Sequence, residues 1–290
     1  MKYECVAELK GEFPVQMMCR LLMVKPTGFY AWKRRPPSHR SIANERLKKQ
    51  ITQVHAESDG VYGSRKVKDE LLLLGFLAGR HRIARLMGEL GLYGCPRKRY
   101  RVTTQSKHGY QIAPNRLKQD FSADAPNQKW VADITYIRTQ EGWLYLAAVL
   151  DLYSMAVIGW SMSDRINRQL AMDALQMAVA QRRPGTDLIH HSDRGSQYAS
   201  TDYQKLLKAQ GISGSMSGTG NCYDNAAMES WFGLLKRERV NRRSYRTRAE
   251  ARQDVFDYIE RFYNRRRPHA SAGRMSPLMY EAATLNQPVH

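Results

Sequence analysis

The sequence is poor in cysteine, and its few cysteines stand far apart. Its 290 residues include 4 cysteines, with no Cys-x-x-Cys and no histidine pair at zinc-finger distance from any of them. Zinc sites in small domains are built from such closely spaced ligands. We therefore expect no zinc finger, and we interpret all four as buried or bystander thiols: Cys5, Cys19, Cys95 and Cys222.

Long uninterrupted apolar runs are also absent. The longest stretch, WLYLAAVLDLYSMAVIGW from Trp143 to Trp160, is broken by Asp151 and Ser154, whereas a membrane helix needs about 20 consecutive apolar residues. The first residues, MKYECVAELKGEFPV, carry acids and no apolar block with a small-residue cleavage site, so no secretory signal is visible. A pair of strands fits the apolar stretch better, and we expect a cytoplasmic protein without a membrane partner.

Acidic residues are scarce in both ends of the chain. Residues 1–119 hold 24 basic and 9 acidic residues (net +15), residues 120–229 hold 9 and 12 (net −3), and residues 230–290 hold 13 and 6 (net +7). Two basic flanks around an acidic middle are expected when the flanks bind a polyanion and the centre gathers carboxylates for another task. The hydrophobic content of 42% is enough for at least one sizeable core.

The first 100 residues predict helices. Residues 1–40 contain a short helical pattern, FPVQMMCRLLMV, and the stretch from Ser41 to His55 repeats apolar residues at helical spacing. Two more helical patterns, GVYGSRKVKDELLLLG and AGRHRIARLMGELGLYG, are separated by Gly75 and Gly79. Residues 41–100 therefore predict either a helix-turn-helix-like DNA-binding domain or an ordinary helical hairpin with a solvated basic face, and the uneven charge favours DNA. The candidate DNA contacts here are Arg65, Lys66, Arg80, Arg82 and Arg85.

A basic linker over residues 101–123 leads to a segment of different character. Three stretches rich in β-branched and aromatic residues predict a meander, after which strand and helix patterns alternate. We predict an α/β core over residues 124–240, with a mixed sheet and helices on both faces, and a basic helical region over residues 241–290. The expected strands are 129–138, 143–152, 154–163, 187–192 and 212–217, and the expected helices are 167–183, 200–211, 224–240 and 248–264.

Three acids in the core segment are placed to act together. Asp133 lies in the middle of a predicted strand, where a buried carboxylate needs a compensating partner. Asp193 follows a later strand in HHSDRGSQYAS, where it also fits a turn residue, and Glu229 lies on the helix after CYDN. Asp133 and Asp193 are separated by 59 residues, and Asp193 and Glu229 by 35. Convergent carboxylates of this kind suit an oxygen-ligand site for Mg²⁺ or Mn²⁺.

The acid spacing, together with WVADITYI, HSDRGSQY and GNCYDNAAMES, resembles the retroviral-integrase (DDE) superfamily of transposases. Within it, the chain is similar to the catalytic second-reading-frame (OrfB) protein of the insertion-sequence-three family of bacterial elements. The resemblance covers nearly the whole chain, through FPVQMMCRLLMVKPTGFYAW, YGSRKVKDEL, RIARLMGELGL and YNRRRPH. It departs from the family at HASAGRMSP, where an aromatic residue is usual near Arg274, and the zinc domain that opens retroviral integrases is missing.

The resemblance implies an RNase H-like core in which Asp133, Asp193 and Glu229 are the catalytic and metal-binding residues. Two Mg²⁺ ions, with Mn²⁺ as a substitute, would stabilise the entering and leaving oxygens of an in-line phosphodiester displacement. Because no covalent protein intermediate is required, hydroxyl residues near the acids are interpreted as positioning or packing groups, namely Tyr136, Ser196 and Tyr198.

Further residues around the acids have two interpretations each. Lys236 lies two helical turns after Glu229 and either contacts DNA near the active site, as the superfamily implies, or belongs to a solvated charge run. Arg194 is a further candidate DNA contact. GTGNCYDN is interpreted as a mobile active-site loop whose polar residues cap the catalytic helix, with Asp224 as a fourth ligand in a minority interpretation. Of His190 and His191, one is expected to face the core and the other the acid site.

The sequence thus predicts a transposase that cleaves and joins DNA at the ends of its insertion sequence and integrates them into target DNA. The expected partners are terminal inverted repeats, target DNA, further copies of the chain and, through a frameshifted fusion, an upstream-frame protein; the protein would be nucleoid-associated when bound to DNA. Two alternatives stay open: a non-catalytic DNA-binding regulator, which would not depend on Asp133, and an RNase H-like nuclease acting on RNA–DNA hybrids.

Overall fold

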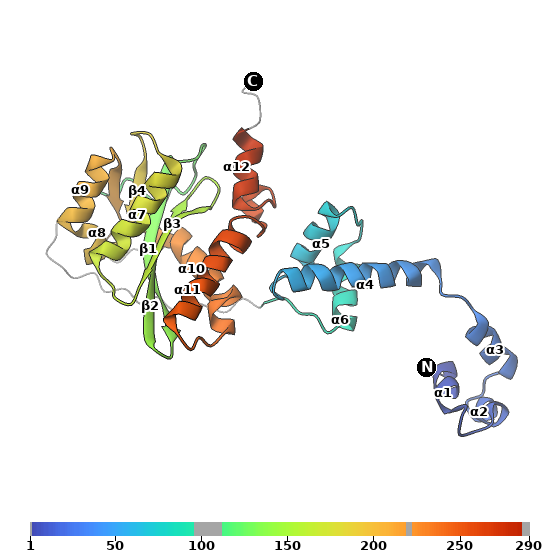
Figure 1. The fold of residues 1–290 in the computed structure, drawn as a ribbon. Helices are drawn as coiled ribbons and strands as arrows, with labels where there is room; N and C mark the ends of the chain where they lie inside the picture. The colour runs from blue at the N-terminus through green and yellow to red at the C-terminus, as the bar shows by residue number, and fades with distance from the viewer. Residues whose placement is uncertain (1, 96–111, 219–221, 286–290) are drawn as a thin grey trace.

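The computed structural model describes residues 2–95, 112–218 and 222–285, and its first three helices form a small unit at one end of the chain (Figure 1). These helices are α1 (Lys2–Leu9), α2 (Val15–Leu21) and α3 (Pro26–Arg34). Pro26 stands in the first turn of α3, where a missing backbone N–H costs nothing. The unit has its own core of Val6, Met18, Cys19 and Phe29.

Three further helices form the predicted helix-turn-helix-like unit: α4 (His39–Glu57), α5 (Ser64–Leu73) and α6 (Arg80–Glu89). The backbone N–H of Ser41 donates to Ser38 Oγ at 3.2 Å and caps the start of α4. The apolar residues that repeat at helical spacing meet between the three helices and are buried, among them Leu47, Ile51, Val67, Ile83 and Leu86. The helical periodicity predicted for residues 41–100 is therefore confirmed for the described part of this segment.

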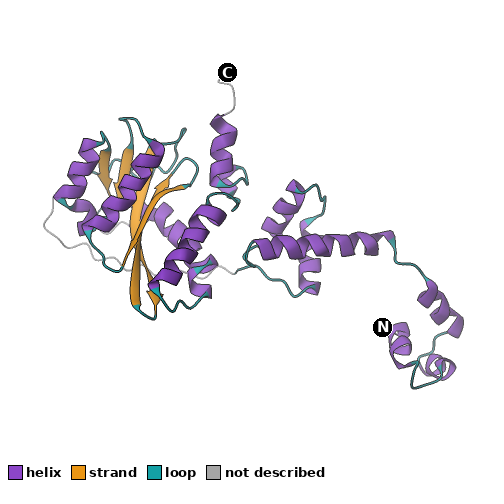
Figure 2. Cartoon of the chain, viewed as in Figure 1, coloured by secondary structure: helices purple, strands orange, loops and turns teal. Residues whose placement is uncertain are grey.

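The core sheet has five strands in the order β3-β2-β1-β4-β5, and Figure 2 shows helices on both of its faces. The first three form the predicted antiparallel meander, while β4 and β5 run parallel to β1. The strands are β1 (Lys129–Thr139), β2 (Gly142–Asp151), β3 (Val157–Ser163), β4 (Ile189–Ser192) and β5 (Ser213–Met216). The mixed α/β architecture predicted from the sequence is confirmed.

One face of the sheet is covered by α7 (Arg168–Arg182), with α8 (Ser196–Ala199) and α9 (Thr201–Ala209) beside it. Alternate residues of β1, such as Trp130 and Ala132, pack on this side. A Cβ on Gly159 of β3 would lie 2.2 Å from the carbonyl oxygen of Ala174. A glycine is needed there because α7 lies directly on the strand.

The other face is covered by helices from the last third of the chain, α10 (Ala226–Glu238) and α11 (Arg248–Phe256). A 3₁₀ turn (Cys222–Asn225) precedes α10, another (Val240–Arg242) follows it, and a π-helical segment (Asp257–Tyr263) extends α11. Asn264 exchanges two hydrogen bonds with the backbone of Val157, at 3.0 and 2.8 Å, and so ties this region to β3. The chain then passes a last 3₁₀ turn (Ala270–Ala272) and ends in α12 (Pro277–Leu285).

The second half of the predicted linker packs along β5: the backbone N–H groups of Arg116 and Leu117 donate to Ser215 Oγ at 2.9 and 3.3 Å. Residues 101–111 of that linker lie outside the described residues. No helix within the described ranges is long and apolar enough to cross a membrane.

Candidate active site

Two of the three predicted acids lie side by side because of how the sheet is paired. Strands β1 and β4 are parallel neighbours whose last partners in register are Ala132 and Ser192. The next residue of each strand path is Asp133 and Asp193, respectively. Residues at the carboxyl ends of neighbouring parallel strands point into the same space, which is where α/β proteins place their ligands. The fold thus brings together two carboxylates that have 59 residues between them in the sequence.

Backbone donors orient both carboxylates. The Ile134 N–H donates to Asp133 Oδ1 at 2.7 Å, and the Gly195 N–H donates to Asp193 Oδ1 at 2.9 Å. The second bond closes the turn after β4, so the turn interpretation of Asp193 holds together with its place beside Asp133. Both side chains are partly buried.

Glu229 reaches the same region from a different element. It lies in the first turn of α10, a helix that packs on β1. The pairing of β1 with β4 stops at Ala132, and further along β1 the described residues add to this edge an isolated bridge from Thr139 to Tyr245. Glu229 is partly buried, and burial raises the pKa of its carboxyl group.

The three acids share one electrostatic environment. Burial raises the pKa of Asp133 well above its usual range, and the negative charges of Asp193 and Glu229 raise it further. Within the described ranges, however, no three His, Cys, Asp or Glu side chains are close enough together to form a group that could hold a metal ion as they stand. The acids therefore face one place without being drawn into a tight cluster.

Lys236 lies over β1 and not in a solvated charge run. Its Nζ is 4.6 Å from the centroid of the Tyr136 ring, which is close enough for a cation–π contact. Burial lowers the pKa of Lys236, and the charge of Asp133 opposes that shift. The structure thus brings Lys236 to the acid site, as the seven-residue spacing from Glu229 predicted.

The loop before α10 differs in detail from the prediction. Asp224 is buried, and its Oδ2 accepts hydrogen bonds from Asn115 Nδ2 at 3.0 Å and the Gly218 N–H at 2.7 Å. It therefore anchors the loop to the linker, a partnership that no local sequence signal indicated. The expectation that Asn225 caps α10 is wrong: its side chain makes no cap bond, and its Nδ2 lies 3.5 Å from the Ala132 carbonyl oxygen instead. The other expected caps are Asp224, whose bonds to Asn115 and Gly218 are those just described, and Asn221, which lies outside the described residues.

Neither predicted histidine faces the acids as a free base. His190 Nε2 lies 3.1 Å from the Tyr203 hydroxyl, and His191 bonds Ser215 Oγ at 2.8 Å and Ser217 Oγ at 3.2 Å. Burial lowers the pKa of His190 to about 3 and that of His191 to about 4, so both are neutral at pH 7. His190 thus faces the helix side of the sheet, as expected for one of the two. That His191 points toward the acid site stays a prediction; it lies on the opposite face of β4, where the charge of Asp224 acts on it.

Tyr198 is a further residue of the site. Its ring is buried, and its hydroxyl has no hydrogen-bond partner among the residues that the structure describes. Burial raises the pKa of this hydroxyl well above its usual range, and the charges of Asp133 and Asp193 contribute. Tyr198 is thus a neutral, unpaired donor next to the two aspartates.

Comparison with known proteins places this geometry in a family. The model of the integrase core domain matches residues 123–222, a second integrase core model matches residues 210–277, and an HTH-like domain model matches residues 43–100. Transposase InsF for insertion sequence IS3A of Escherichia coli (strain K12) is 42% identical over 287 residues, covering 98% of this chain and 100% of that protein. The chain belongs to the insertion-sequence-three family of transposases.

Other similar proteins include the insertion element IS600 uncharacterized 31 kDa protein of Shigella sonnei, 44% identical over 263 residues, which cover 91% of the transposase chain and 97% of that protein. Among solved structures, the simian T-cell lymphotropic virus intasome in complex with PP2A regulatory subunit B56 gamma has a TM-score of 0.48 at 16% identity, covering 83% of this chain and 77% of that chain. The family assignment rests on the sequence matches and not on this likeness.

The predicted DNA contacts of the transposase fall into two groups. Lys66 does not reach the surface: its Nζ is buried, lies 5.0 Å from the centroid of the Tyr62 ring and has no hydrogen-bond partner within the described ranges. We therefore remove Lys66 from the candidate DNA contacts. The guanidinium group of Arg194 is also engaged within the protein, since its Nε donates to the Ser217 carbonyl oxygen at 2.6 Å.

The remaining candidates lie on the helix-turn-helix-like unit. Arg65 and Arg80 are exposed. Arg82 Nε donates to Asn44 Oδ1 at 2.9 Å, and Arg85 pairs with Glu89 one turn later on α6. Arg65 and Arg80 can therefore contact a phosphate directly, whereas Arg82 and Arg85 would first have to give up their bonds to Asn44 and Glu89.

Proposed function

We propose that this transposase cleaves DNA strands at the ends of its insertion sequence and joins them to target DNA, with Asp133, Asp193 and Glu229 as its catalytic carboxylates. The observation that carries the proposal is the register of β1 and β4, which sets Asp133 beside Asp193 below the helix that presents Glu229. Phosphodiester chemistry on DNA needs carboxylates gathered in this way.

The donor set suits Mg²⁺, which prefers carboxylate oxygens and keeps part of its water shell. Asp133 supports this fit, because its carboxyl group is partly buried between two other acidic side chains and a divalent cation would compensate their repulsion. We propose that the three acids hold two Mg²⁺ ions, with Mn²⁺ as a substitute. Bound there, the metal would activate the attacking water or 3′-hydroxyl and stabilise the departing oxygen.

The chain's own residues have separate tasks. The three carboxylates supply the negative charge that binding a divalent cation needs. The backbone N–H groups of Ile134 and Gly195 fix the orientation of Asp133 and Asp193, respectively. Lys236 lies on the same helix as Glu229 and near Asp133, where its charge would pair with a phosphate next to the scissile bond. Tyr198 is buried and its hydroxyl stays protonated, so it is a positioning group and not a nucleophile.

The partners follow from the other domain and from the family. The exposed arginines of α5 and α6 would contact terminal repeats and target DNA through phosphates. We also propose that copies of the chain assemble on DNA to hold two ends, and that the chain is also made as a frameshifted fusion with an upstream-frame protein.

Strand transfer with candidate terminal repeats tests this function. Purified full-length protein with Mg²⁺ should join a labelled, pre-cleaved terminal duplex to target DNA, and EDTA should abolish joining. A protein that binds the duplex without joining it would be a regulator. Cleavage of an RNA–DNA hybrid in preference to duplex ends would identify an RNase H-like nuclease instead.

A further inference from the structure

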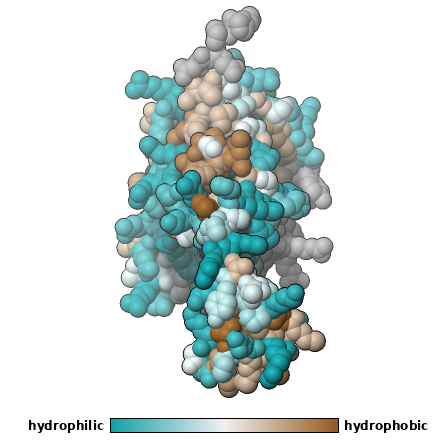
Figure 3. Space-filling view, turned by 90° about the vertical axis from the view of Figure 1, so that its right-hand side faces the viewer, coloured by the Kyte–Doolittle hydropathy of each residue, from teal (hydrophilic) through white to brown (hydrophobic). Residues whose placement is uncertain are grey.

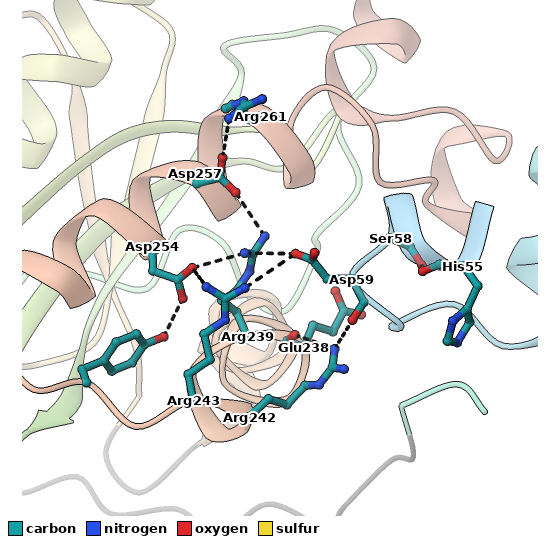
Figure 4. Close-up of polar contacts among 11 residues, drawn as sticks. His55, Ser58, Asp59, Glu238, Arg239, Arg242, Arg243, Asp254, Asp257 and Arg261 are labelled. Carbon is teal, nitrogen blue, oxygen red and sulfur yellow. Dashed lines mark hydrogen bonds and ion pairs between the residues drawn. The ribbon is translucent and has the colours of Figure 1, made fainter. Parts of the chain in front are cut away.

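The helix-turn-helix-like unit meets the catalytic unit at a charged junction (Figure 4). The end of α4 lies against the end of α10: Arg239 Nη1 is 3.1 Å from Asp59 Oδ2, and Arg242 Nη1 donates to the Asp59 carbonyl oxygen at 2.8 Å. Gly60 has φ +69°, and a Cβ there would lie 3.3 Å from Arg242 Nη2. The turn after α4 is therefore shaped so that an arginine can lie on it.

In each ion pair between the two units, the acid comes from the helix-turn-helix-like unit and the arginine from the catalytic unit. Besides Asp59, the helix-turn-helix-like unit contributes Glu57, which lies 3.0 Å from Arg266 Nη2, and Asp69, which pairs with Arg274. Every acid of these pairs comes from the end of α4 or from α5, and every arginine follows Glu229 in the sequence. We call the acids the junction acids (Glu57, Asp59 and Asp69) and the exposed cations that pair with their carboxylates the junction arginines (Arg243, Arg266 and Arg274).

The catalytic unit does not depend on the junction acids for its own charge balance. Arg239 is buried and also bonds Asp254 at 3.2 Å and Asp257 at 3.3 Å, and Arg243 pairs with Asp254 as well. Asp59 is 51% exposed but pairs with the buried Arg239, and Asp69 is only 15% exposed. The pair of Glu57 and Arg266 is, by contrast, half exposed on both sides, at 48% and 56%. Exposed pairs of this kind contribute about 0 to 1 kcal/mol each and are screened by salt.

The centre of the contact between the two units is apolar and packed: the ring centroids of Tyr62 and Phe262 are 6.0 Å apart, and both residues belong to one buried cluster. The edge of the contact is more open. A cavity of 370 Å³ lies between them, lined by Leu72 and Leu73 of α5 and by Met279 of α12. Figure 3 shows apolar surface at the height of α12 and α5, surrounded by hydrophilic side chains. A second cavity, of 400 Å³, is lined by Glu57, Asp59 and exposed arginines of the segment after α11. The contact thus has a packed apolar centre and a polar, hollowed edge, and the ion pairs to the junction acids lie at this edge.

We propose that the junction arginines form a DNA-phosphate-binding surface that the junction acids occupy in the DNA-free chain. Carboxylates and phosphates are alternative ligands for the same guanidinium groups, and both accept paired N–H donors. A DNA duplex presents a dense row of phosphates, so it displaces three isolated carboxylates and takes over the arginines. This inference rests on the proposed DNA-processing function and adds to it a second contact surface, which is masked while the junction acids pair with its arginines.

A permanent clamp between the two units predicts the opposite response to mutation. If the pairs only hold the units together, removing the acids loosens the protein and leaves DNA affinity unchanged or lower. If the acids compete with DNA, removing them raises affinity. The sign of the change therefore separates the two roles.

The test compares two full-length variants of equal net charge. The first, Glu57→Gln/Asp59→Asn/Asp69→Asn, removes the junction acids; the second, Asp124→Asn/Asp187→Asn/Asp202→Asn, removes three acids of the catalytic unit away from the junction. Fluorescence anisotropy with a labelled random-sequence duplex gives Kd at several salt concentrations. We expect the first variant to bind at least about threefold more tightly than the second, with a log–log salt slope steeper by about 0.9 for each arginine released.

An equal or weaker affinity of the first variant would overturn the proposal. The arginine side gives a second measurement that does not depend on that variant folding: Arg266→Gln/Arg274→Gln should change the affinity of the otherwise wild-type chain little, but should cancel the gain in the acid-free background. A large loss in the wild-type background would mean that the arginines are never masked. Wild-type protein that binds no duplex would instead contradict the proposed function, so the two failures are distinguishable.

Discussion

Lys236 lies with its amino group 4.6 Å from the ring centroid of Tyr136, so the helix that carries Glu229 touches the strand that carries Asp133 through a cation and an aromatic ring. The contact falls on the part of β1 beyond its pairing with β4 and before the isolated bridge from Thr139 to Tyr245. Tyr136 is 46% exposed, which leaves one side of this pair accessible. The lysine is thus fixed at the edge of the acid site before DNA arrives.

Lys236→Ala should lower strand joining more than DNA binding. The lost contact to a phosphate near the scissile bond, worth roughly 1.4 kcal/mol, reduces the rate by a factor of about ten. Lys236→Arg should keep much of the activity because a phosphate accepts either cation. The measurement is the joining rate on pre-cleaved terminal DNA at saturating concentration, with Lys208→Ala, an exposed lysine on α9, as the control. Equal, small effects of Lys236→Ala and Lys208→Ala on the joining rate would show that Lys236 is an ordinary surface charge and not a contact to the reacting phosphate.

Asp133→Asn, Asp193→Asn and Glu229→Gln should each abolish cleavage and joining and leave duplex binding intact. Each change keeps the shape of the side chain and removes a charge that an oxygen-ligand metal site requires. The expected loss is at least about a hundredfold in joining rate with Mg²⁺, a few kcal/mol in the activation barrier. Asp173→Asn, which removes an acid hydrogen-bonded to Gln169 on α7, serves as the matched control. Near-wild-type joining by any of the three variants would contradict its role.

Much of the core was predictable because its signals are local. Alternating and β-branched stretches gave the strands, and apolar residues at helical spacing gave the helices, to within a few residues at their ends. The closeness of Asp133 and Asp193 was not local: it depends on the parallel register of β1 and β4, which only the resemblance to a family indicated. Spacing along one helix was enough to bring Lys236 to the same place as Glu229.

Contacts between distant segments could not be predicted in this way. Lys66 belongs to a basic stretch, and nothing in that stretch shows that its amino group is buried close to the charges of Arg267 and Glu238, which come from the last third of the chain. Asp224 is likewise bound by Asn115, 109 residues earlier. The net charge of the C-terminal region was read as free for a polyanion, whereas several of its arginines are paired with acids of the helix-turn-helix-like unit. Net charge counts residues and not their partners.

Lys66→Met should stabilise the protein at neutral pH and leave DNA affinity unchanged. Burial lowers the pKa of Lys66 to about 8 in the folded chain, against about 10.4 when unfolded. Below pH 8 both states carry the charge and the folded state bears the cost of burying it. Between about pH 8 and 10.4 the folded chain loses the proton first, so wild-type stability rises with pH. The variant's advantage, about 1 to 2 kcal/mol at pH 7, should therefore shrink over that range.

Urea denaturation at a series of pH values measures this difference. Arg80→Gln provides the comparison for DNA, because Arg80 is exposed on the same unit. It should weaken duplex binding and reduce the log–log salt slope by about 0.9, whereas Lys66→Met should leave the slope as it is. A Lys66→Met variant that bound DNA as weakly as Arg80→Gln would show that the lysine turns outward to the phosphates.

Arg267→Leu should cost about 3 to 5 kcal/mol of unfolding free energy, because it leaves a buried carboxylate without its cation. Arg267 bonds Glu238 through Nε at 2.7 Å and Nη2 at 2.6 Å, and the two side chains are only 6% and 4% exposed. Among the described residues, the Tyr258 hydroxyl, at 3.0 Å, would be the remaining hydrogen-bond donor to the Glu238 carboxylate. A single neutral hydrogen bond does not replace a paired guanidinium in a buried place.

The double variant Arg267→Leu/Glu238→Leu separates lost charge pairing from lost packing. Since replacing a whole buried pair by apolar residues is often neutral, the double variant should recover most of the stability that Arg267→Leu loses. Arg261→Ala is the control: its side chain is 79% exposed and pairs with Asp257 within one helix, so its removal should cost less than about 1 kcal/mol. Since Glu238 is the last residue of α10, the same measurement reports how firmly the helix that carries Glu229 is held. A double variant no more stable than Arg267→Leu would mean that the pair acts through its shape and not through its charge.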